Sequence, residues 1–225
     1  MNIFLYLYTE FLWRPIFNGL IWLYNTAALQ DLGLAIIIFT LIVRLVLMPL
    51  FGKAQKSQRE LARIQPEMKK IQERLKGDRE AQGKALMELY ARHKVNPFSG
   101  CLSLLVQLPL LITIFQVFRT GFENENLAYL YSFIAHPGSL NPISLGILNL
   151  SEGSIYLGVV AAVSQFFFTK LSMPTPNAAA QSSTDFAAIF QKQSLYIFPA
   201  LILVWSYTLP SALTLYWTVF NIFGI

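Results

Sequence analysis

Apolar residues form several runs along the chain that are long enough to cross a lipid bilayer. The clearest run extends from Leu32 to Phe51 and directly follows Asp31, a residue type that caps helix starts. Twenty helical residues at about 1.5 Å each cover about 30 Å, the thickness of the hydrocarbon layer. The pattern predicts five membrane-spanning helices. The other four lie at 97–118, 154–171, 193–209 and 210–225, and the last is short enough that we expect it to be truncated.

Residues 1–31 precede the first run and mix apolar with polar positions. Their apolar residues recur at helical spacing: Leu12, Ile16, Leu20 and Leu23. Glu10, Arg14 and Pro15 interrupt them. We predict an amphipathic helix in the membrane interface on the extracytoplasmic side. The alternative, that this segment is itself a span, would put a charge pair and a proline inside the bilayer.

Residues 52–96 form a polar insert with two helical stripes. The first stripe alternates steps of three and four residues, as a coiled-coil seam does, and consists of Leu61, Ile64, Met68, Ile71 and Leu75. Gly77-Asp78 is typical of a turn. The second stripe consists of Ala81, Ala85, Leu86, Leu89 and Tyr90. The pattern predicts an antiparallel helical hairpin, with a kink or break at Pro66.

Composition and charge agree with a membrane protein and give its orientation. Only 13% of the residues are charged, about half of the usual share. Residues 53–94 hold twelve of the 17 Lys and Arg and six acidic residues, a net charge of +6. Basic loops stay cytoplasmic. We therefore place 52–96 and the loop 172–192 inside the cell, and the N-terminus and the loop 119–153 outside.

Arg44 is the one charged residue deep in a predicted span. It lies about 10 Å from the inner end of that span, so its side chain could reach the headgroups or face a wet cavity. Position alone leaves both open, but Thr40 one turn earlier and a glutamine in each of two other spans favour a shared polar surface. His93 and His136 are isolated, so we predict no metal site. The chain has no reliable Ser/His/Asp arrangement, and we expect no cofactor and no enzymatic reaction.

The basic insert also has more than one interpretation. It could be a solvated coiled coil or a platform on anionic lipid. It could also contact an acidic or amphipathic partner from the cytoplasm, such as a nascent chain or ribosomal RNA. Charge alone does not choose among these. The candidate contact residues of the insert are Arg63, Lys69, Lys70, Arg74 and Lys76.

Several stretches of the chain resemble the YidC/Oxa/Alb family of membrane protein insertases, of the bacterial YidC type. They are IIIFTLIVRLVLMPL at 36–50, KAQ at 53–55, QPEMKKIQERL at 65–75, LYARHKVNPFSGCLSLLVQLP at 89–109, QFFFTKLS at 165–172 and LPSALTLYW at 209–217. The resemblance covers nearly the whole chain in the order of the family. It implies an all-α membrane protein with five transmembrane helices around a hydrophilic groove, a cytoplasmic helical hairpin and an N-terminal interfacial helix.

By this resemblance, the groove opens to the cytoplasm and to lipid, and Arg44 is its arginine. The other residues that the family pattern places in the substrate-binding groove are Thr40, Gln107, Gln165, Tyr216 and Trp217. The implied function is insertion of newly made membrane proteins without ATP hydrolysis, in the bacterial cytoplasmic (inner) membrane. The implied partners are nascent membrane proteins and the lipid bilayer, with the ribosome and the Sec translocon as candidates. No specific nucleic acid and no small-molecule substrate is expected.

Two rival functions predict different observations. A transporter that uses Arg44 as an anion site should contain internal repeats and paired broken helices, and solute flux without a client protein would support it. A membrane chaperone would hold subunits without translocating anything. Protection of a translocated tail from protease would separate insertion from that role.

Overall fold

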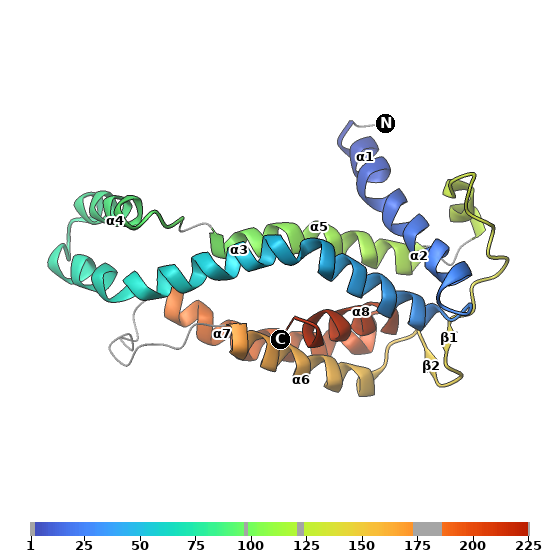
Figure 1. Cartoon of the computed structure of the whole chain (residues 1–225). Helices are drawn as coiled ribbons and strands as arrows, with labels where there is room; N and C mark the ends of the chain where they lie inside the picture. Colours follow the sequence, from blue (N-terminus) through green and yellow to red (C-terminus); the bar gives the residue numbers. More distant parts are fainter. Residues whose placement is uncertain (1–2, 97–98, 121–123, 173–185, 225) are drawn as a thin grey trace.

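The computed structural model describes residues 3–96, 99–120, 124–172 and 186–224, and these are mostly helical. The longest helix, α3 (Leu32–Arg74), runs along the whole molecule, with α5 (Ser99–Thr120) beside it (Figure 1). Three helices pack together along the other side: α6 (Ile155–Ser172), α7 (Phe186–Thr208) and α8 (Ser211–Ile222). The N-terminal helices lie at one end of α3 and α4 (Arg79–His93) lies at the other.

The N-terminal segment is helical from Ile3 to Thr26, as α1 (Ile3–Tyr8), a π-helical turn (Thr9–Trp13) and α2 (Arg14–Thr26). Its buried face differs from the expected one. Leu20 and Leu23 are buried, but Leu12 is exposed, and Trp13 and Phe17 pack into the main core in its place. Apolar residues occur on more than one face of this segment, so helical spacing alone did not identify the buried face.

Helix α3 begins at the expected cap and continues far beyond the expected first span. The Asp31 carboxylate accepts a hydrogen bond from the Leu34 amide at 2.9 Å, which caps the helix. The helix then includes 43 residues without a break, so the break considered at Pro66 does not occur. At about 1.5 Å per residue, α3 is about 65 Å long, roughly twice the hydrocarbon thickness.

Helix α4 follows a turn at Gly77-Asp78 and packs back on the end of α3. Asp78 caps α4 by accepting a hydrogen bond from the Ala81 amide at 3.0 Å. A small apolar cluster joins the two helices. Its buried members are Ile64, Leu89 and Val95, with Leu61, Met68, Ile71 and Tyr90 against them. Most of the seam expected on α3 is in this cluster, but Leu75 is not. Of the stripe expected on α4, Leu89 and Tyr90 are in the cluster, whereas Leu86 and the two alanines are not.

The remaining helix bounds are close to the expected spans, with two differences. Helix α7 begins at Phe186, earlier than the expected 193, and α8 has only 12 residues. A short β-hairpin, β1 (Ile143–Ser144) with β2 (Leu148–Asn149), interrupts the expected all-α architecture. It lies beside the start of α3 (Figure 1).

Within the described residues, two helices are long and apolar enough to cross a membrane by length and composition. They are Leu32–Arg74 and Ile155–Ser172. Gln107–Arg119 is a shorter apolar helical stretch. Large apolar side chains are exposed along the outer faces of α3, α6 and α7, for example Val46, Val159 and Tyr207. Such surfaces fit a lipid solvent better than water.

Candidate functional site

Arg44 extends from α3 into a group of phenylalanine rings contributed by three helices. Its guanidinium carbon lies 4.3 Å from the ring centre of Phe220 on α8. It lies 5.1 Å from the ring of Phe51 on α3 and 5.4 Å from the ring of Phe168 on α6. These distances are in the range of cation–π attraction. Within the described part of the chain, no carboxylate is at ion-pair distance from Arg44.

A second polar group joins α6 and α8 around Gln165. The Gln165 carbonyl oxygen accepts hydrogen bonds from the Trp217 indole at 3.0 Å and from the Asn221 amide at 3.1 Å. The Asn221 amide also donates to the Ser164 hydroxyl at 3.3 Å, and the Gln165 amide donates to the Thr169 hydroxyl at 2.9 Å. Gln165 and Trp217, two of the expected groove residues, are therefore in direct contact.

Asn221 is a functional candidate that the sequence reasoning missed. It is 1% exposed and lies one helical turn after Trp217, so both side chains reach Gln165. The signal available in the sequence was a lone amide near the end of an apolar run. A buried amide inside a bundle is costly unless it is hydrogen-bonded, and here two acceptors on α6 satisfy it.

A third polar contact joins α5 and α8. The Gln107 amide donates to the Tyr216 hydroxyl at 3.3 Å, and Tyr216 is 1% exposed. The Gln107 carbonyl oxygen is buried, and no donor among the described residues is at hydrogen-bond distance from it. A buried acceptor without a donor destabilises the fold by about 1–3 kcal/mol. This atom is therefore free to accept a hydrogen bond from a group outside the described residues.

Thr40 is placed differently from the other expected groove residues. Its side chain is fully buried, and its hydroxyl donates to the Ile36 carbonyl of the same helix at 2.6 Å. The structure thus gives Thr40 a bond within α3, and no bond to the polar groups of α5, α6 or α8 among the described residues.

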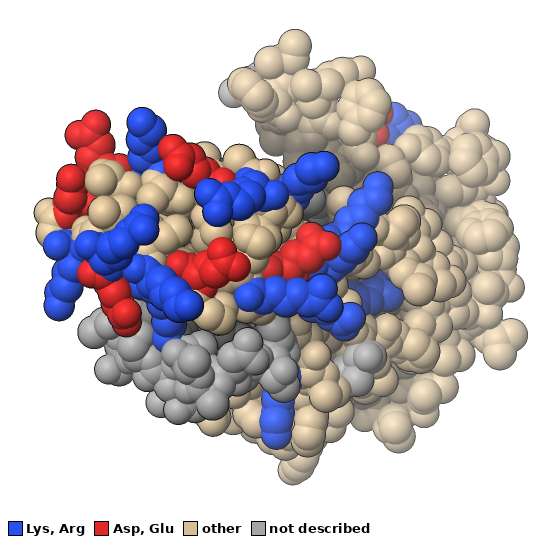
Figure 2. Space-filling model, turned by 60° about the vertical axis from the view of Figure 1, so that its left-hand side comes forward, with Lys and Arg blue, Asp and Glu red and all other residues tan. Residues whose placement is uncertain are grey.

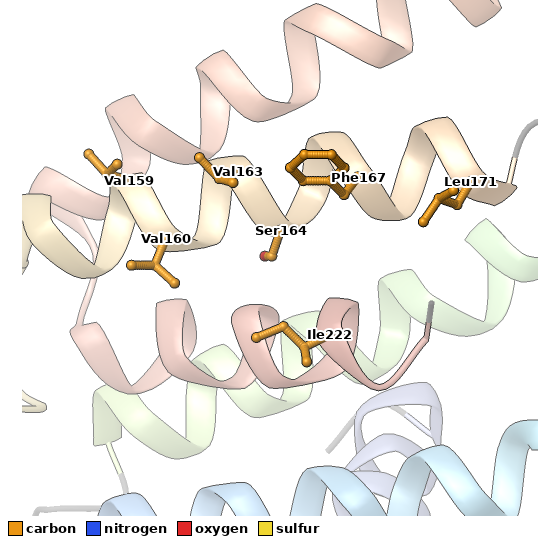
Figure 3. A pocket seen from close by; sticks show the side chains of 7 residues that line it. All are labelled: Val159, Val160, Val163, Ser164, Phe167, Leu171 and Ile222. Carbon is orange, nitrogen blue, oxygen red and sulfur yellow. The ribbon is translucent and has the colours of Figure 1, made fainter.

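An apolar groove of about 500 Å³ lies between α6 and α8 (Figure 3). It is lined by Val159, Val160, Val163, Ser164, Phe167, Leu171 and Ile222. None of the expected groove residues lines it. Ser164 connects it to the polar group, because its hydroxyl accepts the bond from Asn221. An apolar surface groove therefore lies directly beside buried amide groups.

At the end of the helices away from Arg44, the loop before α6 and the helix ends are closely packed. The carbonyl of Glu152 accepts bonds from both the amide and the hydroxyl of Ser211, and the carbonyl of Leu150 accepts from the Ala212 amide. Leu150, Ser211 and Ala212 are all 0% exposed. A Cβ atom on Gly153 would meet the Tyr207 carbonyl. The loop before α6 therefore packs directly on the ends of α7 and α8.

Asp31 joins the β-hairpin to this same end. Its two carboxylate oxygens accept bonds from the Ser144 hydroxyl at 2.7 Å and the Leu145 amide at 2.6 Å, in addition to the cap of α3. Burial raises the pKa of Asp31, but hydrogen bonds from Leu145, Ser144, Leu34 and Gly33 outweigh it, so the pKa lies below its usual range. The carboxylate therefore stays ionised at neutral pH.

The basic residues gather on the part of the molecule formed by the end of α3 and by α4, as Figure 2 shows. Four of the five candidate contact residues are exposed, namely Arg63, Lys70, Arg74 and Lys76. Lys69 differs, because its side chain is only 9% exposed. An ion pair between His93 and Glu67 at 3.6 Å connects the two helices when His93 is protonated.

The chain is similar in sequence to known proteins. The family model described as 60Kd inner membrane protein matches residues 22–225. A protein of Fusobacterium nucleatum named membrane protein insertase YidC is 34% identical over 87% of this chain and 83% of its own length. Proteins of the same name from Anaeromyxobacter dehalogenans, and named YidC 1 from Listeria monocytogenes, are each 35% identical. The chain spans 32% and 61% of their lengths.

Proposed function

Because the chain belongs to the 60Kd inner membrane protein family, we propose that it is a membrane protein insertase. It takes hydrophobic segments of newly made proteins from the cytoplasm into a polar groove within the membrane. It then releases them sideways into the bilayer without ATP hydrolysis. The observation that carries this proposal is the Arg44 charge, which has no acidic partner among the described residues and lies between the helices.

We place the protein in the bacterial inner membrane with five spans. These are the first part of α3 up to about Phe51, then α5, α6, α7 and α8. The basic end formed by α3 and α4 faces the cytoplasm, because basic loops remain on that side. The N-terminus and the β-hairpin then face outward, and the end of α8 near Arg44 faces inward.

The groove proposed here combines the polar groups of the inner half. Arg44, Gln107 and Gln165 come from three different helices, and each lies against α8 through Phe220, Tyr216 or Asn221. A client's polar flank would meet these groups and water instead of bare hydrocarbon, which lowers the cost of its entry. An acidic flank gains most, because the arginine charge attracts it.

The apolar part of the client has a separate place to bind. The groove lined by Val163, Phe167 and Ile222 is open at the outer surface of α6 and α8, where lipid would be. The client's apolar side chains leave water first for this groove and afterwards for lipid. This transfer is favourable by about 0.8 kcal/mol of free energy per CH₂ group. Sideways release therefore needs no further source of energy.

The packing at the end opposite Arg44 supports a groove that is closed on the outside. There, Ser211 bonds to the Glu152 carbonyl, and Gly153 lies directly against the Tyr207 carbonyl.

The basic residues at the cytoplasmic end are the proposed first contact for clients. Arg63, Lys70, Arg74 and Lys76 are exposed there and would attract an acidic or amphipathic nascent chain, the ribosome or anionic lipid headgroups. The Sec translocon is a further candidate partner. These contacts concentrate clients near the groove, whereas the groove residues act on the inserted segment.

The test compares Arg44→Ala with Arg44→Lys in liposomes reconstituted with the purified protein. We expect Arg44→Ala to lower insertion of clients with acidic translocated tails about tenfold, the equivalent of ~1.4 kcal/mol. Arg44→Lys should retain most of the activity, because it keeps the charge. The control is the same client with its acidic residues changed to amides, which should insert equally with all three proteins.

Protection of the client tail from added protease measures true insertion. Client binding without protection would indicate a chaperone, and solute flux in the absence of a client would indicate a transporter. Normal insertion of acidic tails by Arg44→Ala would contradict the proposed role of the groove charge.

A further inference from the structure

The guanidinium of Arg44 is surrounded by Phe51, Phe168 and Phe220, which we call the phenylalanine cage. All three rings lie within 5.4 Å of the guanidinium carbon. The rings also contact one another, because Phe220 meets Phe51 edge-on at 5.9 Å and Phe168 at 6.5 Å. The cage is thus one connected aromatic cluster, with Phe220 at its centre.

The rings of the cage interact with the guanidinium as a carboxylate would in an ordinary buried ion pair. An aromatic ring attracts a cation through its negative face, and the attraction strengthens when water is excluded. Unlike a carboxylate, a ring does not neutralise the charge. The guanidinium is therefore held in place while its positive charge remains available to an incoming group.

The cage also stands on the route by which Arg44 would reach the headgroups. Phe51 lies two helical turns after Arg44 on α3, toward the basic end, which is about 10 Å along the helix. Because the ring centre is only 5.1 Å from the guanidinium carbon, the two side chains must extend toward each other. The ring thus occupies the path along α3 that a snorkelling arginine would follow.

Gly224 adds a steric requirement after the end of α8. A Cβ atom at this position would meet the Arg44 guanidinium and would lie 2.6 Å from the Phe168 ring. Any side chain here would force Arg44 or Phe168 to move. The backbone at Gly224 therefore lies against the cage.

We propose that Phe51, Phe168 and Phe220 are positioning residues, which hold the charge of Arg44 inside the groove and out of the headgroup layer. The inference rests on the proposed function, since a positioned charge matters only if a client's polar flank meets it. Phe220 should have the largest effect, because its ring is nearest to the guanidinium and contacts both other rings.

The test measures the position of Arg44 directly, without a client. Phenylglyoxal modifies accessible arginines, and peptide mass spectrometry reads the rate at each site. We expect Phe220→Leu to raise the rate at Arg44 about tenfold in proteoliposomes. The exposed Arg63 serves as the internal reference. The matched control is Phe118→Leu, which changes an equally buried ring of α5 (4% exposed against 6%) and should leave the rate at Arg44 unchanged.

A second variant separates the ring's electrostatics from its packing. Replacing Phe220 with 3,4,5-trifluorophenylalanine keeps the ring shape and removes its negative face, so it should also raise the rate at Arg44. If the rate at Arg44 stays at its parental value in both Phe220 variants, the cage does not position the arginine and the inference is wrong.

Insertion assays then distinguish this inference from the proposed function. If the Phe220 variants expose Arg44 and also lower insertion of acidic clients, the cage positions the charge that clients meet. Arg44→Ala could lower insertion while the Phe220 variants change neither the modification rate at Arg44 nor insertion. In that case the proposed function stands, and the positioning role of the phenylalanine cage is wrong. If the variants expose Arg44 but Arg44→Ala inserts clients normally, the cage stands as a structural feature and the groove mechanism fails.

Discussion

The two ends of the helices differ in whether their buried polar groups have partners within the chain. At the end around Asp31 and Ser211, each carboxylate, hydroxyl and carbonyl named above has partners within the chain. At the end around Arg44 and Gln107, the guanidinium has aromatic rings but no carboxylate, and one amide oxygen has no donor among the described residues. The polar groups of the first end are therefore hydrogen-bonded within the chain. At the second end, polar groups remain that can interact with another molecule.

Under the proposed function, this difference corresponds to a bundle that is closed on the outside and receives clients on the inside. Satisfied hydrogen bonds and the close packing at Gly153 stabilise the first end. The second end tolerates an unsatisfied acceptor and an unpaired charge, which cost stability. The proposed function assigns these groups to the client, which satisfies them transiently. Mutations should therefore affect stability at the first end and insertion at the second.

The largest effect on stability should come from a methyl group added at the closed end. In Gly158→Ala, the new Cβ atom would meet the Ser206 hydroxyl and lie 2.5 Å from its Cβ, so α6 and α7 must separate. We expect a loss of about 1–3 kcal/mol, measured by thermal unfolding in detergent. The matched control is Gly83→Ala in α4, where nothing lies within 4 Å and the change should be neutral or stabilising.

Equal melting temperatures for the two glycine variants would show that the closed end is loosely packed. That result would remove the main contrast between the two ends. Ser206→Gly, combined with Gly158→Ala, should recover part of the lost stability, because it removes the colliding side chain.

A smaller effect is expected when the Asp31 carboxylate is changed. In Asp31→Asn, an NH2 group takes the place of the oxygen that accepts from the Leu145 amide. An NH2 group cannot accept that bond, so we expect about 1–2 kcal/mol of destabilisation, whereas the remaining oxygen can still accept from Ser144 and Leu34. Asp78→Asn is the matched control, because Asp78 also caps a helix but accepts only the Ala81 bond among the described contacts.

The pH dependence of Asp31 gives a second measurement. Its folded pKa lies below the unfolded value of about 3.9, because the hydrogen bonds outweigh burial. The stabilisation is therefore complete above the unfolded pKa and is lost as pH falls through the folded pKa. Asp31→Asn should lack this part of the acid dependence. A parallel acid profile for parent and variant would contradict the role of the carboxylate.

Much of the helical framework could be predicted from the sequence, because apolar periodicity is a local property. Two features could not. The β-hairpin has strands of two residues, too short for an alternating pattern, and Asp31 contacts it from far away in the chain. Helix α3 continues through Pro66 since a proline removes one hydrogen bond while the packing against α4 extends across it.

The candidate site was predictable only in part. The sequence indicated Arg44 and Gln165 because polar groups are rare in apolar runs. It could not indicate the phenylalanine cage, because phenylalanine is common throughout the chain and the three rings come from three helices. Asn221 was missed for a similar reason, since its partners on α6 are defined only by packing.

The smallest effect on stability should come from removing a polar pair at the receptive end. In the double variant Gln107→Met with Tyr216→Phe, both partners of the 3.3 Å bond become apolar, and the unsatisfied carbonyl oxygen disappears. Replacing both partners of a buried bond is nearly neutral or stabilising. We therefore expect a melting temperature within about 2 °C of the parent, from ~0.5 kcal/mol or less. Insertion of acidic clients should nevertheless fall several-fold, because the groove loses two polar groups.

The single variant Gln107→Met, which leaves the buried Tyr216 hydroxyl without its donor, is the control and should be less stable than the double variant. A double variant that loses stability but inserts clients normally would contradict the proposed difference between the two ends. The polar pair would then stabilise the fold and would not contribute to insertion.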